Sequence, residues 1–237
     1  MSENRIYHRR TGTRRAFALL LFLTLLIYSN TFRASWHLDD YQNIVYNNRV
    51  HIEELSPHSL SRVIRPPLYD RIWRPISFLT FAGNWYFGSD NVFGYHLVNI
   101  FIHALTSWVI FLTVVRIFMT PVLRNIYGDA RYLIALMSAV LWSVNPIHTQ
   151  AVTYIVQRMT LLATFFYALS LLCYIQARLI DAGSRKRAFI VGCCLSFLIG
   201  VGCKEITATL PIALILVEAA FFQDLANPKV RKKIIVL

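Results

Sequence analysis

Long apolar stretches alternate with short polar segments along most of the chain. Roughly 20 apolar residues in a helix cross the hydrocarbon core of a bilayer, which is about 30 Å thick. Six stretches approach that length and composition, at residues 16–35, 98–119, 131–144, 159–180, 188–203 and 206–222. The pattern predicts an all-α membrane protein, a polytopic helix bundle with about six spans.

Only Lys204 and Glu205 separate the fifth stretch from the sixth. Joined as one helix of 35 residues, they would extend about 52 Å at about 1.5 Å per residue, far beyond a core of about 30 Å. We therefore expect a tight hairpin there, made easier by Gly200 and Gly202. The third stretch is short, and we expect it to continue into the segment after Pro146.

The apolar pattern divides the chain into segments of one membrane domain. The segments are a cytoplasmic tail (1–15), a first span (16–35), an outer loop (36–92), five further spans (93–225), and a basic flank that begins another span (226–237). The first span lacks a clean small-residue cleavage site, so it is interpreted as a retained helix and not a signal peptide. Because residues 226–237 resemble the start of another span, the domain over 1–237 is expected to be truncated at its end.

Charge supports a membrane protein and gives its orientation. Charged residues make up 15% of the chain, against about 25% in soluble domains. The formal net charge is +12, a value that in a soluble protein would favour nucleic-acid binding. Here 16 basic and four acidic residues fall on the N-terminal side of the predicted membrane, whereas the outer loop balances six with six. The positive-inside rule then places the N-terminus in the cytoplasm and excludes nucleic acid as the partner.

The outer loop is expected to hold interfacial helices. Its segment "RPISFLTFAGNWYFG" (74–88) mixes apolar residues with Trp85 and Tyr86, which suits a helix lying at the membrane surface. The cysteines all fall within apolar stretches, so a disulfide or zinc framework is excluded.

An acidic pair, Asp39 and Asp40, follows the first span in "SWHLDDYQN". Neighbouring side chains point in different directions, so the two carboxylates do not act as a matched pair. We expect one to face a reaction, as a base kept poised by poor hydration. The other then holds the loop, accepts backbone hydrogen bonds or helps to bind a cation. An ordinary solvated loop remains the alternative.

Polar residues at the outer ends of the spans suggest a site at that boundary, because polar groups at membrane depth are usually functional. His96, Asn99 and His103 share one helical face. They could form a metal site, or the imidazoles could be hydrogen-bonded between helices. The basic residues would neutralise a lipid-linked phosphate, or else snorkel or form ion pairs. The outer-face set is Asp39, Asp40, Arg74, His96, His148, Arg158, Lys204 and Glu205.

Five motifs then occur in register across about residues 16–225. They are "WHLDDYQNIVYNN", "RPISFLT", "GYHLVNIFIHAL", "NPIHTQAVTYIVQRMTLLATFFYALSLLCYIQAR" and "CKEITATLP". Together they resemble the membrane half of the tetratricopeptide-repeat-containing O-mannosyltransferase-like proteins, in a form closer to bacterial members. That group belongs to the GT-C glycosyltransferases. Asn145 departs from the pattern, which more often has His at that position.

The resemblance implies that a sugar such as mannose is transferred with inversion from a polyprenyl- or dolichyl-phosphate donor to a protein Ser/Thr or other hydroxyl. The transfer would take place on the non-cytoplasmic face. Asp39 would be the catalytic base, with Arg74, Arg158 and Lys204 near the phosphate. Magnesium or manganese at Asp39 and Asp40 is left open. The membrane would be a bacterial inner membrane, or the endoplasmic reticulum in a eukaryote.

A non-catalytic membrane scaffold or a transporter-like module is the alternative function. A transporter would place its ionisable groups near the bilayer midplane, whereas here they lie at the outer ends of the spans.

Overall fold

The computed structural model describes residues 2–65, 73–126 and 130–223, with side chains from residue 12 onward. The helices are α1 (Ser2–Ile27), α2 (Pro57–Ile64), α3 (Pro75–Gly88), α4 (Val92–Ile117), α5 (Arg131–Ser143), α6 (Thr149–Thr153), α7 (Arg158–Leu179), α8 (Ser184–Cys203) and α9 (Leu210–Phe221). Shorter turns join them: η1 (Ser29–Arg33), η2 (Tyr41–Val45), η4 (Pro146–His148), η5 (Ile155–Gln157) and η6 (Glu205–Thr209). The expected start of a seventh span lies outside the described residues.

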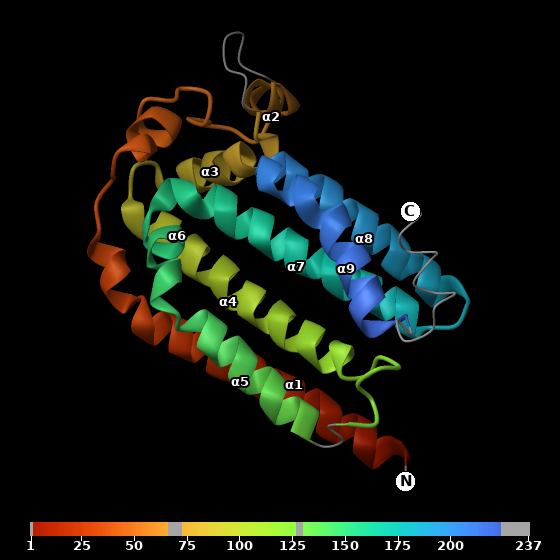
Figure 1. Cartoon of the computed structure of the whole chain (residues 1–237). Coiled ribbons are helices and arrows are strands. Elements are labelled where there is room, and N and C mark those ends of the chain that lie inside the picture. Colours follow the sequence, from red (N-terminus) through yellow and green to blue (C-terminus); the bar gives the residue numbers. More distant parts are fainter. Residues whose placement is uncertain (1, 66–72, 127–129, 224–237) are drawn as a thin grey trace.

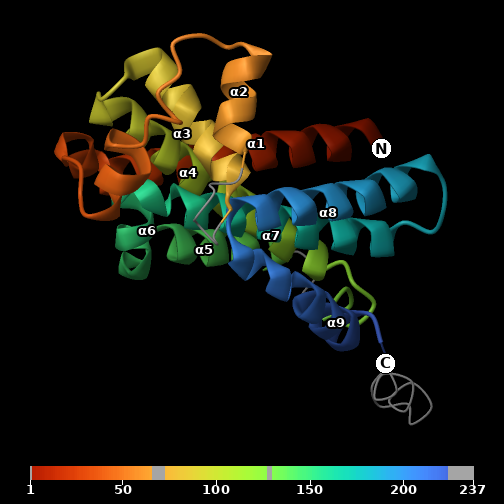
Figure 2. The ribbon, with the colours of Figure 1, turned by 90° about the horizontal axis from the view of Figure 1, so that it is seen from above.

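The long helices run back and forth between two ends of one bundle (Figure 1). Helix α4 packs against α1, α5 and α7, and α7 packs against α8. We call the end formed by residues 28–65, 73–91, 144–157 and 204–209 the loop end. Seen from above, α2 and α3 gather there, whereas α9 diverges from α8 toward the C-terminus (Figure 2).

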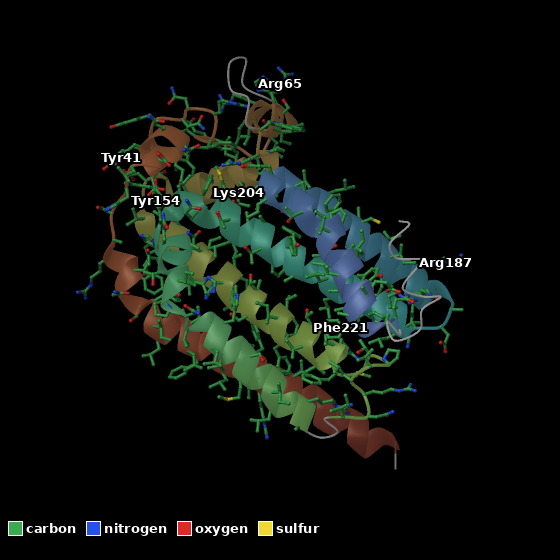
Figure 3. All side chains as sticks on the ribbon, in the orientation of Figure 1. Tyr41, Arg65, Tyr154, Arg187, Lys204 and Phe221 are labelled. Carbon is green, nitrogen blue, oxygen red and sulfur yellow. The ribbon has the colours of Figure 1, made fainter. Side chains whose placement is uncertain are left out.

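Basic side chains gather at the opposite end of the bundle. Arg116 lies in the last turn of α4, Arg131 begins α5 and Arg178 lies in the last turn of α7, while Arg185 and Arg187 lie in the first turn of α8. Figure 3 labels Arg187 at this end and Tyr41, Tyr154 and Lys204 at the loop end. The segregation of charge expected from the sequence is therefore present in the fold.

Three helical segments of the described chain are long and apolar enough to cross a membrane: Val92–Ile117, Ile155–Leu179 and Ser184–Cys203. They correspond to the second, fourth and fifth predicted spans. Helix α5 is apolar but shorter, and α9 has 12 residues. The prediction of an all-helical membrane protein is confirmed, whereas the number of spans stays a prediction.

Two predicted boundaries are wrong. The first helix ends at Ile27 and not near Ser35, because the chain tightens into the 3-10 turn η1 from Ser29. The third helix does not continue past Pro146, but ends at Ser143. A residue before proline disfavours the α conformation, and proline itself lacks an N–H. Asn145 is accordingly extended, and its side chain accepts the Ile147 N–H.

The predicted break between the fifth and sixth stretches is confirmed. Lys204 is extended, with φ −160° and ψ 140°, and the chain then turns back through η6 into α9. A Cβ atom at Gly200 would lie 2.7 Å from the Thr207 side chain, and one at Gly202 would lie 2.9 Å from Ile76. Both glycines therefore let η6 and α3 approach α8 closely, because neither carries a side chain.

The outer loop is held by an apolar core of its own. Buried loop residues, among them Ile44, Ile52 and Val63, pack against Phe81 of α3 and Ile155 of η5. The guanidinium of Arg49 donates to the carbonyl oxygens of Arg62, Val63 and Arg65, which close the C-terminus of α2. Segment 75–88 is helical, as predicted. These contacts fix the loop to the bundle.

A fully buried guanidinium joins α3, α4 and α7 at the loop end. Arg158 Nε donates to Asn99 Oδ1 at 2.8 Å, Nη1 to the Thr80 carbonyl at 3.1 Å, and Nη2 to the Tyr95 carbonyl at 3.0 Å. The group lies 4.9 Å from the centre of the Phe81 ring. Its charge is solvated by oxygen dipoles and ring faces, since buried charges need such compensation.

We expect the substitution Arg158→Lys to destabilise the fold by about 2–4 kcal/mol, because an ammonium cannot reach three acceptors in a planar fork. Arg187→Lys, at an exposed position of α8, is the matched control and should leave stability unchanged. Thermal unfolding of the purified protein in detergent measures both effects. Equal unfolding temperatures for the two variants would show that the guanidinium has no structural role.

Candidate active site

Asp40 is a structural member of the acidic pair. Its side chain is 1% exposed; Oδ1 accepts the Val156 N–H at 2.7 Å and Oδ2 accepts the His37 N–H at 3.0 Å. Burial raises the pKa of the Asp40 carboxyl above its ordinary value, and the two backbone hydrogen bonds oppose that rise. Asp40 therefore ties the outer loop to the turn before α7.

Asp39 is exposed and points elsewhere. Its backbone N–H donates to the Tyr154 hydroxyl at 2.7 Å, and the Asn43 amide donates to its carbonyl at 2.8 Å. The two neighbouring aspartates thus occupy different environments, one buried and one in solvent contact. A catalytic role for Asp39 stays a prediction.

The backbone immediately before Asp39 is strained. Leu38 has a φ of +36°, which is uncommon outside glycine and persists only where surrounding contacts enforce it. Two backbone hydrogen bonds enforce it here, from the Asp40 N–H to the His37 carbonyl and from the Tyr41 N–H to the Leu38 carbonyl. Strain of this kind is typical of functional loops.

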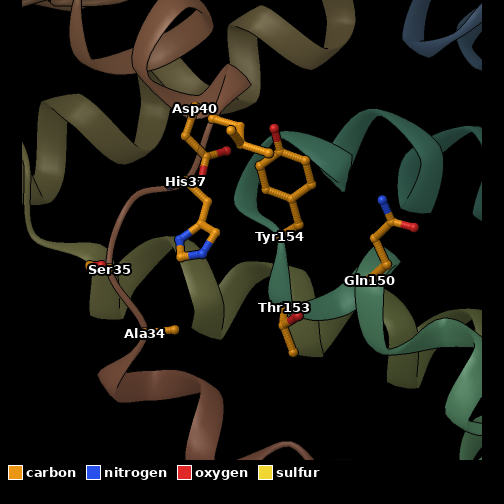
Figure 4. Close-up of a pocket in the computed structure, with 8 residues that line it drawn as sticks. Ala34, Ser35, His37, Asp40, Gln150, Thr153 and Tyr154 are labelled. Atoms are coloured by element: carbon orange, nitrogen blue, oxygen red, sulfur yellow. Dashed lines mark hydrogen bonds between the residues drawn. The ribbon is translucent and has the colours of Figure 1, made fainter.

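A pocket of about 300 Å³ lies beside the acidic pair. It is lined by Ala34, Ser35, His37, Leu38, Asp40, Gln150, Thr153 and Tyr154. Figure 4 shows the loop on one side of this space, with His37 and Asp40, and the α6 segment on the other, with Gln150, Thr153 and Tyr154. Asp39 lies between two of the lining residues in sequence and contacts a third, Tyr154. We call this space the loop pocket.

Tyr154, His37, Gln150 and Thr153 were not identified from the sequence. Tyr154 falls within a motif quoted for the family resemblance, yet nothing in its spacing relates it to residue 39. Burial, reinforced by the negative charges of Asp39 and Asp40, raises the pKa of Tyr154 above its ordinary value of 10. The phenol is therefore protonated at neutral pH and able to donate a hydrogen bond.

Two of the three expected phosphate-binding residues, Arg74 and Lys204, lie at the loop end with side-chain partners of their own. Arg74 forms a bidentate ion pair with Glu205, Nη2 to Oε1 at 2.7 Å and Nε to Oε2 at 3.0 Å. Lys204 Nζ donates to Thr160 Oγ1 at 2.8 Å. Burial, and the charge of Arg74, lower the pKa of Lys204, while the hydrogen bond from Arg74 lowers the pKa of Glu205.

The remaining predicted residues do not line the loop pocket. Arg158 is inside the bundle, so its position does not support contact with a substrate. His96 is buried, with Nε2 3.0 Å from the Ala34 carbonyl, and therefore supports the loop from below. His148 immediately precedes α6, and its ring lies near those of Trp142 and His103. The fold thus brings Asp39 and Asp40 together with Tyr154, whereas the Arg158 guanidinium is hydrogen-bonded to Asn99, Thr80 and Tyr95.

The residues present do not form an evident cation site. Both Asp40 oxygens already accept backbone N–H groups. In the part of the chain that the structure describes, no three His, Cys, Asp or Glu side chains gather as metal ligands. Magnesium or manganese held by the acidic pair therefore finds no support in this geometry.

Curated proteins named protein O-mannosyl-transferase match the chain. Tmtc1 of Drosophila melanogaster is 30% identical over 161 residues, which is 64% of this chain and 17% of the relative. TMTC2 of Mus musculus is 32% identical over 159 residues, 65% of this chain and 18% of the relative. A Caenorhabditis elegans relative is 24% identical over 242 residues, 90% of this chain and 34% of that protein.

The chain therefore spans between about a sixth and a third of these curated relatives. No family model matches it, and no solved structure does. The resemblance inferred from the five motifs is confirmed by the relatives' names and their similarity to this sequence.

We expect Asp40→Ala to lower the unfolding temperature and Asp39→Ala to leave it unchanged. The first substitution leaves the N–H groups of Val156 and His37 without acceptors, at a cost of about 1–3 kcal/mol. The second removes a carboxylate in contact with solvent. Thermal unfolding in detergent distinguishes them, and similar losses in both variants would contradict the structural role given to Asp40.

Proposed function

We propose that this chain is part of a membrane glycosyltransferase that moves a sugar from a polyprenyl- or dolichyl-phosphate donor to a hydroxyl acceptor. The names of its relatives support mannose as the sugar and a protein as the acceptor. The observation that carries the proposal is the Asp39 carboxylate, exposed beside the loop pocket on a loop that Asp40 and Tyr154 fix in place.

In the proposed reaction Asp39 is the general base. It takes the proton of the acceptor hydroxyl while that oxygen forms a bond to the anomeric carbon. The bond between this carbon and the phosphate oxygen breaks, the lipid phosphate leaves with the electron pair, and the configuration inverts. A positioned carboxylate within hydrogen-bond reach of a hydroxyl can contribute about 10²–10⁴-fold to such a step.

Lys204 is the best placed of the predicted cations to neutralise the leaving phosphate. Its ammonium donates to a threonine hydroxyl, which a phosphate oxygen can replace as acceptor. Arg74 already forms an ion pair with Glu205, and Arg158 is fully buried. Cationic groups act on the charge that develops as the phosphate leaves.

The proposed orientation places the loop end on the non-cytoplasmic face and the N-terminus in the cytoplasm, in a bacterial inner membrane or the endoplasmic reticulum. It is supported by the basic side chains at the opposite end of the bundle. About six spans are proposed in total, of which three are long and apolar enough among the described helices.

A scaffold without catalysis is the competing function. It requires neither a strained residue before an exposed aspartate nor a tyrosine whose hydroxyl accepts the backbone N–H of that aspartate. The loop end has both features, which favour an enzyme.

We expect Asp39→Asn to reduce sugar transfer at least about 100-fold, because the amide cannot accept the proton. The assay uses a polyprenyl-phosphate-mannose donor and membranes containing the full reading frame. Asp90→Asn, which removes another carboxylate near the loop end, is the control and should remain active. Full transfer by Asp39→Asn would rule out this mechanism.

Labelling with a membrane-impermeant thiol reagent tests the orientation. Ser35 and Ser184 are both exposed, at opposite ends of the bundle. In a background without the native cysteines, we expect Ser35→Cys to react from the non-cytoplasmic side and Ser184→Cys only after the membrane is opened. The reverse pattern would place the acidic pair in the cytoplasm and contradict the proposal.

A further inference from the structure

A second cavity, of about 350 Å³, lies between α4, α5, α6 and α7. It shares helix α6 with the loop pocket: Gln150 and Thr153 line the loop pocket, whereas His148, just before α6, and Ala151 line the second cavity. Thr164 extends the cavity along α7, within a segment that is long and apolar enough to cross a membrane. We call this space the inner cavity.

The polar side chains around the inner cavity are buried or already hydrogen-bonded within the protein. His103 is 0% exposed and Thr106 is 1% exposed, so neither presents a polar atom to a ligand. The Thr164 hydroxyl donates to the Thr160 carbonyl at 2.8 Å, and the Thr160 hydroxyl donates to an amide oxygen one turn earlier. A polar ligand would therefore lose its hydrogen bonds to water and gain few in return.

The accessible part of the wall is mainly apolar. It is formed by Trp142, Ile147, Ala151 and Leu161, and none of the described residues that line it is Lys, Arg, Asp or Glu. Burial lowers the pKa of His148 below its ordinary value of 6.5, so this ring is mostly neutral at pH 7. Ile147 is 78% exposed, so the wall reaches the surface of the bundle. An apolar space of this kind suits a hydrocarbon chain.

A cation borders the inner cavity at the loop end. Lys204 Nζ donates to Thr160 Oγ1 at 2.8 Å, and Thr160 lines the cavity. Among the side chains described over 12–65, 73–126 and 130–223, no carboxylate forms an ion pair with Lys204, because the adjacent Glu205 pairs with Arg74. A positive charge beside an apolar space is complementary to a lipid with an anionic head.

We propose that the inner cavity binds the polyprenyl chain of an anionic lipid, the sugar donor, whose phosphate lies at the Lys204 ammonium. The identity of this lipid rests on the proposed function. Because α6 also lines the loop pocket, a chain held in the inner cavity keeps its phosphate at the same end of the bundle as Asp39. A lipid that carries a sugar uses the cavity, the cation and the adjacent loop pocket together. A bilayer phospholipid, the competing occupant, uses only the first two.

The test measures binding of undecaprenyl phosphate, which carries no sugar, so it does not depend on transfer. Native mass spectrometry of the purified full-length protein in detergent gives the affinity. We expect Ala151→Phe to bind about tenfold more weakly than the wild type, because the added ring occupies the space of the chain. Ala188→Phe is the matched control, since Ala188 is exposed on α8 outside the cavity, and it should bind as the wild type does.

Two further variants separate the chain from the head. Ile147→Asn removes an apolar side chain of the wall at an exposed position that the fold does not depend on. It should weaken binding of both undecaprenyl phosphate and uncharged undecaprenol about threefold. Lys204→Gln should weaken binding of the phosphate about tenfold and leave binding of the alcohol unchanged.

Wild-type affinity in both Ala151→Phe and Ile147→Asn would overturn the inference, as would equal weakening in Ala188→Phe. Displacement of undecaprenyl phosphate by an equal concentration of phosphatidylglycerol would make a bilayer phospholipid the occupant and overturn it too. The proposed function fails separately: full transfer by Asp39→Asn with lipid binding intact removes the base and leaves the cavity. Unchanged lipid binding by the cavity variants, with transfer lost in Asp39→Asn, removes only the cavity.

Discussion

A single buried cation organises the loop end of this protein. Arg158 donates to Asn99 and to carbonyl oxygens of α3 and α4, and the Asn99 amide in turn donates to the Val152 and Ile155 carbonyls. An isolated buried charge is strongly unfavourable, so these oxygens must remain in place around the guanidinium. The segment that carries Tyr154 and Val156 is thereby fixed, and it holds the acidic loop through Asp40.

The two adjacent residues of the acidic pair, Asp39 and Asp40, differ in their environment. Both carboxylate oxygens of Asp40 accept backbone hydrogen bonds, whereas the side chain of its neighbour Asp39 faces solvent. The positive φ of Leu38 turns the chain between His37 and Asp39. Rigid positioning of an exposed carboxylate is what general-base chemistry requires, because proton transfer demands a fixed distance to the reacting hydroxyl.

The distribution of charge makes the two ends of the bundle chemically different. One end gathers arginine and lysine around the starts and ends of helices, whereas the other carries the Arg74–Glu205 ion pair and the loop pocket. Polar groups near the bilayer are costly unless they serve a purpose. A substrate with a lipid tail and a polar head would reach a site at this boundary without leaving the membrane.

The apolar periods and the distribution of charge determined the helical class, the break at Lys204 and the different environments of Asp39 and Asp40, because each depends on local composition or on neighbouring residues. The ends of the first helix at Ile27 and of the third helix at Ser143 were predicted wrongly, because hydropathy carries no information about local turn geometry. Only the tertiary structure could decide that Arg158 is enclosed, that Arg74 pairs with Glu205 and that Tyr154 contacts Asp39. Arg158 and Asn99 are 59 residues apart in sequence, Arg74 and Glu205 are 131 apart, and Asp39 and Tyr154 are 115 apart. They come into contact because of how the helices pack, which spacing along the chain does not reveal.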